Sequence, residues 1–189
     1  YSGATVGWTP ASDIVSALEP VAPVTQKGLF GFGEYSERTS ITNLINSSGV
    51  VATDTTGVGT ARSVLAASTY GTDKAIIGYG TTGSNSNLSN LVSNSGVVAS
   101  DTTGVGSARL GLAAASYDGS DKAIFGFGNT GSITSITNLV GNNGVIASDT
   151  SGVGTARNYL AAASYGGDKA LFGYGATGSA DTTRSSLTN

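Results

Sequence analysis

The sequence contains no cysteine, no histidine and no methionine. The chain can therefore form no disulfide, no zinc or copper site with nitrogen or sulfur ligands, and no active site with a Cys or His nucleophile. A pair of carboxylates can still hydrolyse glycosides, but the acidic residues of this chain recur singly and not in pairs. The sequence thus predicts a protein that is not an enzyme, with no catalytic residue, no metal and no cofactor.

Charge and long apolar runs are also scarce. Charged residues make up 11% of the 189 residues, and the 9 Lys and Arg are outnumbered by 12 Asp and Glu, for a net charge of −3. Nucleic-acid binding needs a basic patch to neutralise phosphates, so no nucleic-acid partner is expected. The chain has no apolar run of about 18 residues, and we expect no membrane span.

Glycine, in contrast, is abundant at 29 residues, and much of it lies in an internal repeat. A nine-residue block, Asp-Thr-Thr-Gly-Val-Gly-Thr-Ala-Arg, occurs at 54–62 and returns with small changes at 101–109 and 149–157. The closing arginines are 47 and 48 residues apart. The glycines of this block lack the third Gly or the Lys of a phosphate-binding loop, which favours a turn.

Two further blocks recur in register with the first. One is a strand-like segment that ends in Gly-aromatic-Gly, at 73–80, 121–128 and 168–175, with a degenerate copy at 27–33. The other is Ile-Thr-Asn-Leu or a close variant, at 41–44, 88–91, 136–139 and 187–189. We expect residues 1–26, which hold all three prolines and the only Trp, to be an attachment segment or linker. Residues 27–189 then hold about three and a half repeats, which start near 27, 74, 122 and 169.

Each repeat has the pattern of four short strands. Residues 75–80 alternate in the β sense, with Ala75, Ile77 and Tyr79 expected on one face and forming an aromatic column with their copies. Residues 65–70, 43–45 and 50–52 supply the other strands, and Asn46-Ser-Ser-Gly49 supplies a turn. Four strands in about 47 residues are typical of a β-propeller blade. An open β-repeat stack or a solenoid is the alternative architecture.

The order of these motifs resembles the kelch blade. In that family an Arg precedes a small-residue strand and a double glycine closes the next strand; here the Arg is Arg62, the strand ends in Tyr70, and Gly78-Tyr-Gly80 replaces the double glycine. The family's characteristic Trp has no counterpart, because Trp8 lies outside the repeats. The resemblance implies an all-β fold of consecutive kelch-like propeller blades.

The succession Gly-Val-Gly-Thr-Ala-Arg, Leu-Ala-Ala-Ala-Ser-Tyr and Phe-Gly-Tyr-Gly is also similar to repeats in virion structural and tail proteins of marine tailed phages, cyanophages included. This resemblance implies a structural or adhesive component of a tail or fibre, located in the virion or outside the cell. Its partners would be other virion subunits, further repeats, or host surface glycans. The alternative is a secreted or cell-surface, lectin-like propeller.

Three sets of repeated residues are candidates for ligand or inter-blade contacts. The aspartates favour a turn in which the carboxylate accepts backbone N–H groups, with an oxygen-ligand calcium site as the alternative. The arginines favour anchors between neighbouring blades, with a repeated ligand site as the alternative. The tyrosines suit either packing or stacking on sugars. These residues are Asp54, Asp101 and Asp149; Arg62, Arg109 and Arg157; and Tyr70, Tyr117 and Tyr165.

Overall fold

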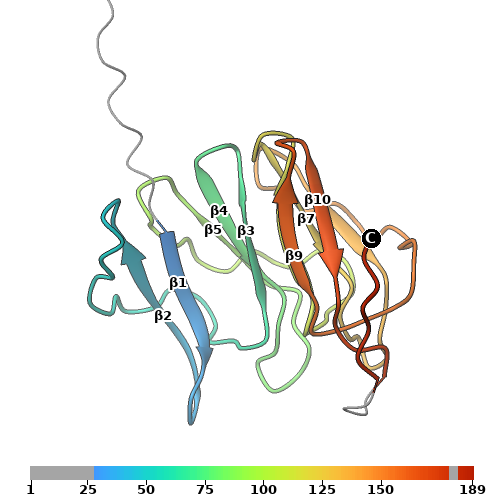
Figure 1. Ribbon diagram of the computed structural model, residues 1–189. Helices are drawn as coiled ribbons and strands as arrows, with labels where there is room; N and C mark the ends of the chain where they lie inside the picture. The colour runs from blue at the N-terminus through green and yellow to red at the C-terminus, as the bar shows by residue number, and fades with distance from the viewer. Residues whose placement is uncertain (1–27, 179–182) are drawn as a thin grey trace, which may run out of the picture.

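The protein is all-β in the part that the structure describes, which confirms the all-β part of the predicted fold class. The computed structural model describes residues 28–178 and 183–189, and these residues form ten strands in small antiparallel sheets (Figure 1). Within these two ranges, no helix is long and apolar enough to cross a membrane. The expected attachment segment 1–26 lies outside the described residues.

The strands belong to four sheets that follow one another along the chain, two of them with three strands and two with two. Sheet 1 is β1 (Gly28–Glu34) and β2 (Arg38–Ile45); sheet 2 is β3 (Ala66–Tyr70), β4 (Lys74–Gly78) and β5 (Ser89–Val92); sheet 3 is β6 (Ala113–Tyr117), β7 (Lys122–Gly126) and β8 (Thr137–Val140); sheet 4 is β9 (Ala161–Tyr165) and β10 (Lys169–Gly173).

The hairpins form where the sequence places turn residues between runs of β-formers. In sheet 2 the register pairs Tyr70 with Lys74 and leaves three residues in the turn, whereas the turn of sheet 3 takes four, residues 118–121. The single extra residue of the third repeat therefore sits in this turn, where Asp118 and Ser120 adopt positive φ. Turns accept such insertions because they do not disturb the strand register.

Four strands per repeat are predicted, but the fourth predicted segment does not form a regular strand. The fourth segment runs antiparallel beside the third strand but makes only isolated bridges, such as Ile45 with Val51 and Thr42 with Thr55. Between these bridges the Ala52 N–H donates to the carbonyl of Leu44 at 2.8 Å. A regular ladder does not form because the residues that follow are Asp, Thr and Gly, which favour turns over strands.

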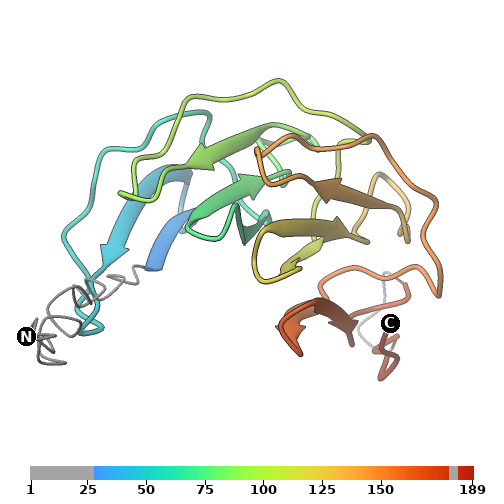
Figure 2. The same cartoon turned by 90° about the horizontal axis from the view of Figure 1, so that it is seen from above.

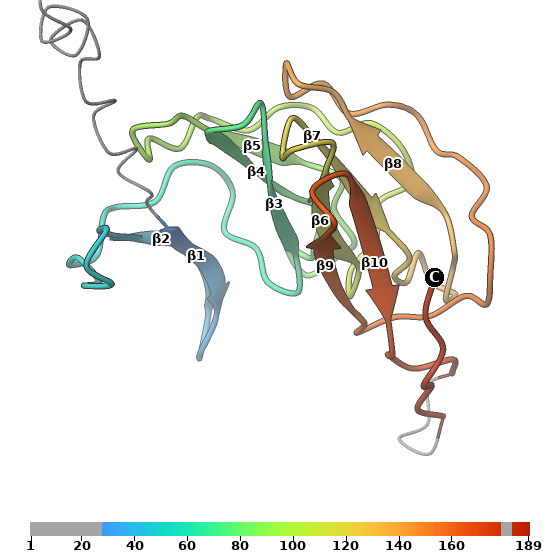
Figure 3. The ribbon, with the colours of Figure 1, turned by 45° about the horizontal axis from the view of Figure 1, so that its top comes forward.

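The sheets stand face to face in a curved row (Figures 2 and 3). The first strands lie close together, β3 against β6 and β6 against β9, and each pair of neighbouring sheets encloses an apolar cluster. The largest cluster joins sheets 2 and 3 and includes Ile76, Tyr79, Phe125 and Val140. Burial between consecutive repeats is what holds an array of this kind together, since each repeat contacts only its neighbours.

One detail of the predicted strand alternation is wrong. Ala75, Ile77 and Tyr79 are expected on one face, but Ile77 faces sheet 1 whereas Tyr79 faces sheet 3, together with Ile76. The cause is the backbone: Tyr79 follows the end of β4 and has a φ of 64°, as its copies Phe127 and Tyr174 do. A left-handed residue breaks the alternation of a strand, so the aromatic side chain turns to the opposite face.

Candidate functional site

The arginines that close the repeated nine-residue block are buried between the sheets. Arg62, Arg109 and Arg157 are each 0% exposed. Each guanidinium lies over the aromatic ring of the Gly-aromatic-Gly motif of the preceding repeat, for Arg62 the ring of Phe32 at 5.1 Å and for Arg109 the ring of Tyr79 at 4.2 Å. A desolvated guanidinium over a ring face is a favourable cation–π contact.

The backbone of each arginine joins the same two sheets. The carbonyl of Arg62 accepts a hydrogen bond from the Gly33 N–H at 2.9 Å, and the carbonyl of Arg109 accepts one from the Gly80 N–H at the same distance. The glycine that ends the Gly-aromatic-Gly motif therefore donates to the arginine of the following repeat. Side chain and backbone together attach each sheet to the next.

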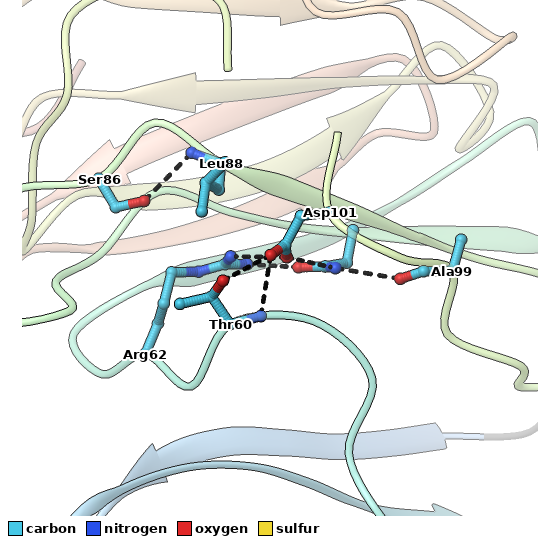
Figure 4. A network of polar contacts seen from close by, with 7 residues as sticks. Thr60, Arg62, Ser86, Leu88, Ala99 and Asp101 are labelled. Atoms are coloured by element: carbon cyan, nitrogen blue, oxygen red, sulfur yellow. Dashed lines mark hydrogen bonds and ion pairs between the residues drawn. The ribbon is translucent and has the colours of Figure 1, made fainter. Parts of the chain in front are cut away.

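Arg62 also belongs to a polar network within sheet 2 (Figure 4). Its guanidinium donates to the Asn90 side-chain oxygen and lies 3.3 Å from Asp101 Oδ1. The Asn90 amide donates to the same Asp101 oxygen at 2.9 Å and to the Ala99 carbonyl at 3.0 Å. Thr60 donates to the other Asp101 oxygen from its backbone N–H, at 2.9 Å, and from its hydroxyl, at 2.6 Å. Both carboxylate oxygens thus have protein partners.

The network changes the acidity of its charged members. Burial lowers the pKa of Arg62, and the nearby Asp101 charge opposes this shift in part. Burial by itself would raise the pKa of Asp101, but the hydrogen bonds from Thr60 and Asn90 and the charge of Arg62 outweigh it and lower the pKa below its usual value. Asp101 is therefore stabilised as a carboxylate in the folded protein.

The third repeat copies this network with one change. Asp149 accepts hydrogen bonds from the backbone and side chain of Ser107 and from the Asn138 amide, and its pKa is lowered in the same way. Arg109, however, uses its Nε to donate to the Phe127 carbonyl at 2.8 Å. In the fourth repeat, the Arg157 guanidinium donates to the side-chain oxygen of Asn189.

Asp54 shows what the network becomes without an arginine. It accepts a hydrogen bond from the Asn43 amide at 2.8 Å, and its side chain is exposed. Residues 1–26, where the pattern would place the matching arginine, contain no Arg or Lys. Within the described ranges, no three acidic residues gather in a way that could hold a metal ion.

A glycine at positive φ lets the side chains of the polar network lie close to the backbone of the Gly-Val-Gly motif. A Cβ on Gly59, whose φ is 88°, would lie 2.5 Å from Asp101 Oδ1 and 2.6 Å from the Asn90 amide nitrogen. Gly106 stands in the same relation to Asp149 and Asn138. The second glycine of the Gly-Val-Gly motif is thus required by this contact and by its backbone conformation.

The three candidate tyrosines have different surroundings. Tyr70 is buried in the apolar cluster between sheets 2 and 3, Tyr117 is half-buried, and Tyr165 is exposed on sheet 4. A sugar cannot stack on the ring of Tyr70 while sheet 3 covers it. The tyrosine positions therefore do not form equivalent sites in successive repeats.

The asparagines of the third repeated block are site residues that the sequence pattern did not predict. Asn90 and Asn138 are fully buried and connect the third strand to the Asp of their own repeat. The signal that identifies them is the recurrence of Asn at one position of the Ile-Thr-Asn-Leu block. A buried amide needs several hydrogen-bond partners, and this spacing supplies them.

A mainly apolar groove of about 590 Å³ lies between sheets 3 and 4. Tyr117, Ile124 and Leu139 of sheet 3 and Phe172 of sheet 4 contribute to its lining. At the preceding junction, Leu91 of sheet 2 lies against the turn of sheet 3 at Gly144.

Comparison with known proteins identifies a shared fold and no family. No protein-family profile and no curated protein matches the sequence. Among solved structures, that of YjhT is similar, with a TM-score of 0.59 and 15% sequence identity over 78% of this chain. The match covers 48% of the YjhT chain, so this chain spans about half the length of that protein. At this identity the likeness concerns the fold alone.

Proposed function

We propose that this chain is a non-enzymatic structural or adhesive protein of a phage particle, associated with its tail or fibres, in which the repeats are consecutive blades of a kelch-like β-propeller. The observation that carries the proposal is that two faces, one on sheet 1 and one on sheet 4, expose apolar side chains: Phe30 and Val51 on the first, Leu171 and Tyr174 on the second. Faces of this kind call for further protein surface, since monomeric proteins rarely expose large apolar patches.

The blade arrangement is supported by the way the sheets are stacked. In sheets 2 to 4 the first strands lie against one another along one side of the row, and in sheets 1 to 3 the irregular fourth segments lie at the opposite edge of the sheet. Sheets that meet closely at one edge and diverge at the other produce the curvature seen in Figure 2. Radial blades around an axis have this geometry.

The repeated charged residues support a structural role. The guanidiniums of Arg62 and Arg109 are buried over rings of the preceding sheet, and both oxygens of Asp101 accept hydrogen bonds from the chain. Groups with a catalytic or ligand-binding role need access to a substrate. Here the repeated Arg side chains instead attach each sheet to the preceding one, and the Asp side chains hold the polar network within a repeat.

The proposed location in a phage particle is based on the resemblance of the repeats to those of virion and tail proteins. The experiment is mass spectrometry of purified particles and of the cell-free medium from a culture that expresses the protein. Peptides from residues 28–178 that copurify with particles at a constant ratio to a capsid protein would support the proposal. Peptides found only in the particle-free fraction would contradict it.

The lectin-like alternative is favoured by one observation, the exposed tyrosines Tyr159, Tyr165 and Tyr174 of sheet 4 and the segment before it. Binding to a glycan array separates an adhesive function from a purely structural one. Loss of glycan binding in Tyr165→Ser, but not in Tyr35→Ser, would place a sugar site on sheet 4. Tyr35 is a suitable control because it is fully exposed and lies in the turn of sheet 1.

A further inference from the structure

The last sheet exposes the side-chain positions that the internal sheets bury. Tyr79 and Tyr70, on the face of sheet 2 that meets sheet 3, are 0% and 3% exposed. Their counterparts in the fourth repeat, Tyr174 and Tyr165, are 64% and 54% exposed. We call this face of sheet 4, formed by Leu171 with these two tyrosines, the C-terminal end face.

The first sheet also exposes positions that an internal sheet buries, but on the face that points away from sheet 2. Phe125 and Ile146, on the face of sheet 3 that meets sheet 2, are 0% and 7% exposed. The corresponding residues of the first repeat, Phe30 and Val51, are 61% and 50% exposed. We call the surface formed by Phe30 and Val51 the N-terminal end face.

The internal junctions show which residues these end faces would meet. Tyr79 of sheet 2 packs on Phe125 of sheet 3, with ring centroids 5.1 Å apart, and Phe127 of sheet 3 packs on Phe172 of sheet 4 at 5.4 Å. In both, the residue after the second strand of one repeat meets the aromatic inside the second strand of the following repeat. Tyr174 occupies the first of these positions and Phe30 the second.

We propose that the C-terminal end face of one copy of this chain binds the N-terminal end face of a second copy, with Tyr174 packed on Phe30. This inference rests on the proposed structural function and names its partner. The contact joins two different surfaces, so it is heterologous: repeated addition gives a closed ring if the curvature allows, and otherwise an open row. Either product continues the stacking that joins the four sheets within one chain.

The contact lacks one component of the internal junctions. Each internal junction has a buried arginine over its ring, whereas residues 1–26, which precede sheet 1, contain no arginine. The contact between copies therefore lacks the cation–π contact of the internal junctions. We expect it to be weaker than an internal junction and to depend on protein concentration.

The test is sedimentation of the 189-residue chain over a range of concentrations, with two variants, Phe30→Asp and Tyr174→Asp. The wild-type chain is expected to self-associate, and each variant to raise the concentration needed for association on the order of tenfold or more. Both substituted residues are exposed, so the variants should keep the β-sheet circular dichroism of the wild type. Tyr35→Asp, which changes a fully exposed aromatic in the turn of sheet 1 that belongs to neither pair of contacting rings, should associate as the wild type does.

Mixing the two variants gives the sharper result. Phe30→Asp keeps an intact C-terminal end face and Tyr174→Asp keeps an intact N-terminal one, so an equal mixture should form a dimer with one native contact and grow no further. A wild-type chain that stays monomeric, association that neither variant weakens, or a mixture that forms no dimer would each overturn the proposal. Particle mass spectrometry is independent of this result, so failure of the copy-to-copy contact and failure of the proposed function are distinguishable.

Discussion

The ring of Tyr79 in sheet 2 packs against the ring of Phe125 in sheet 3 in a T-shaped arrangement, with an angle of 62° between the ring planes. The guanidinium of Arg109 lies over the Tyr79 ring, 4.2 Å from the ring centroid, and the Tyr79 hydroxyl donates to the Val105 carbonyl at 3.2 Å. Tyr79 holds this place with a left-handed backbone, which costs about 1–2 kcal/mol for a residue other than glycine. The contacts of the ring therefore have to offset local strain.

The first prediction concerns this ring pair. Phe125→Ala should lower the free energy of unfolding by about 3–5 kcal/mol, because it leaves a cavity between sheets 2 and 3. Phe30→Ala is the matched control, since Phe30 occupies the same strand position in the first repeat but is exposed; its effect should be about 0.5 kcal/mol. Urea unfolding at a protein concentration too low for self-association measures both. Equal losses would show that Phe125 is not part of the core.

The second prediction compares the loss of stability when two aspartates at the same repeat position are each replaced by asparagine. Asp101→Asn removes a charge that Arg62, Asn90 and Thr60 surround, and should cost about 1–3 kcal/mol. Asp54→Asn changes an exposed carboxylate whose repeat lacks the arginine, and should cost much less. Urea midpoints of the two variants give the comparison. A larger loss for Asp54→Asn would argue against the network.

The third prediction is a dependence of stability on pH. The pKa values of Asp101 and Asp149 are lowered in the folded protein, because their hydrogen bonds and nearby arginines outweigh the effect of burial. The resulting stabilisation is complete above the unfolded pKa of about 3.9 and is lost as pH falls through the lower folded values.

We therefore expect the urea midpoint to fall as the pH is lowered from about 5 towards 2. The double variant with Asp101→Asn and Asp149→Asn should show a smaller decrease over the same range, since it lacks both carboxylates. An identical pH profile for the double variant and the wild type would contradict the assigned shifts.

The fourth prediction concerns Gly106. Gly106 and Gly49 have nearly the same φ, 79° and 78°, but a Cβ on Gly106 would lie 2.3 Å from Asp149 Oδ1, whereas a Cβ on Gly49 would meet nothing within 4 Å. Gly49→Ala should cost about 1 kcal/mol, the effect of positive φ alone. Gly106→Ala should cost at least about 1 kcal/mol more, because the Asp149 network has to move. Equal melting temperatures for the two variants would exclude this contact.

Much of the local structure followed from the pattern of the sequence. The predicted strand 65–70 is observed as Ala66–Tyr70, and Asn46-Ser-Ser-Gly49 forms a turn in which Gly49 has positive φ. Strand alternation and turn residues are local signals, which is why these elements could be predicted. The exception is Tyr79, whose left-handed φ no local pattern indicated, since its ring is held by contacts with sheet 3.

The sequence by itself determined that the chain is an all-β repeat with a period of 47 to 48 residues, because hydrophobic alternation and turn chemistry act over a few neighbours. It also marked Arg62 and Asp101 as recurring, without deciding what they contact. Only the tertiary structure decided that Arg62 is buried over Phe32 and beside Asn90, which lie 30 and 28 positions away along the chain. Such contacts depend on how one sheet stacks on the next, and stacking is set by the packing of whole faces, which no short stretch of sequence contains.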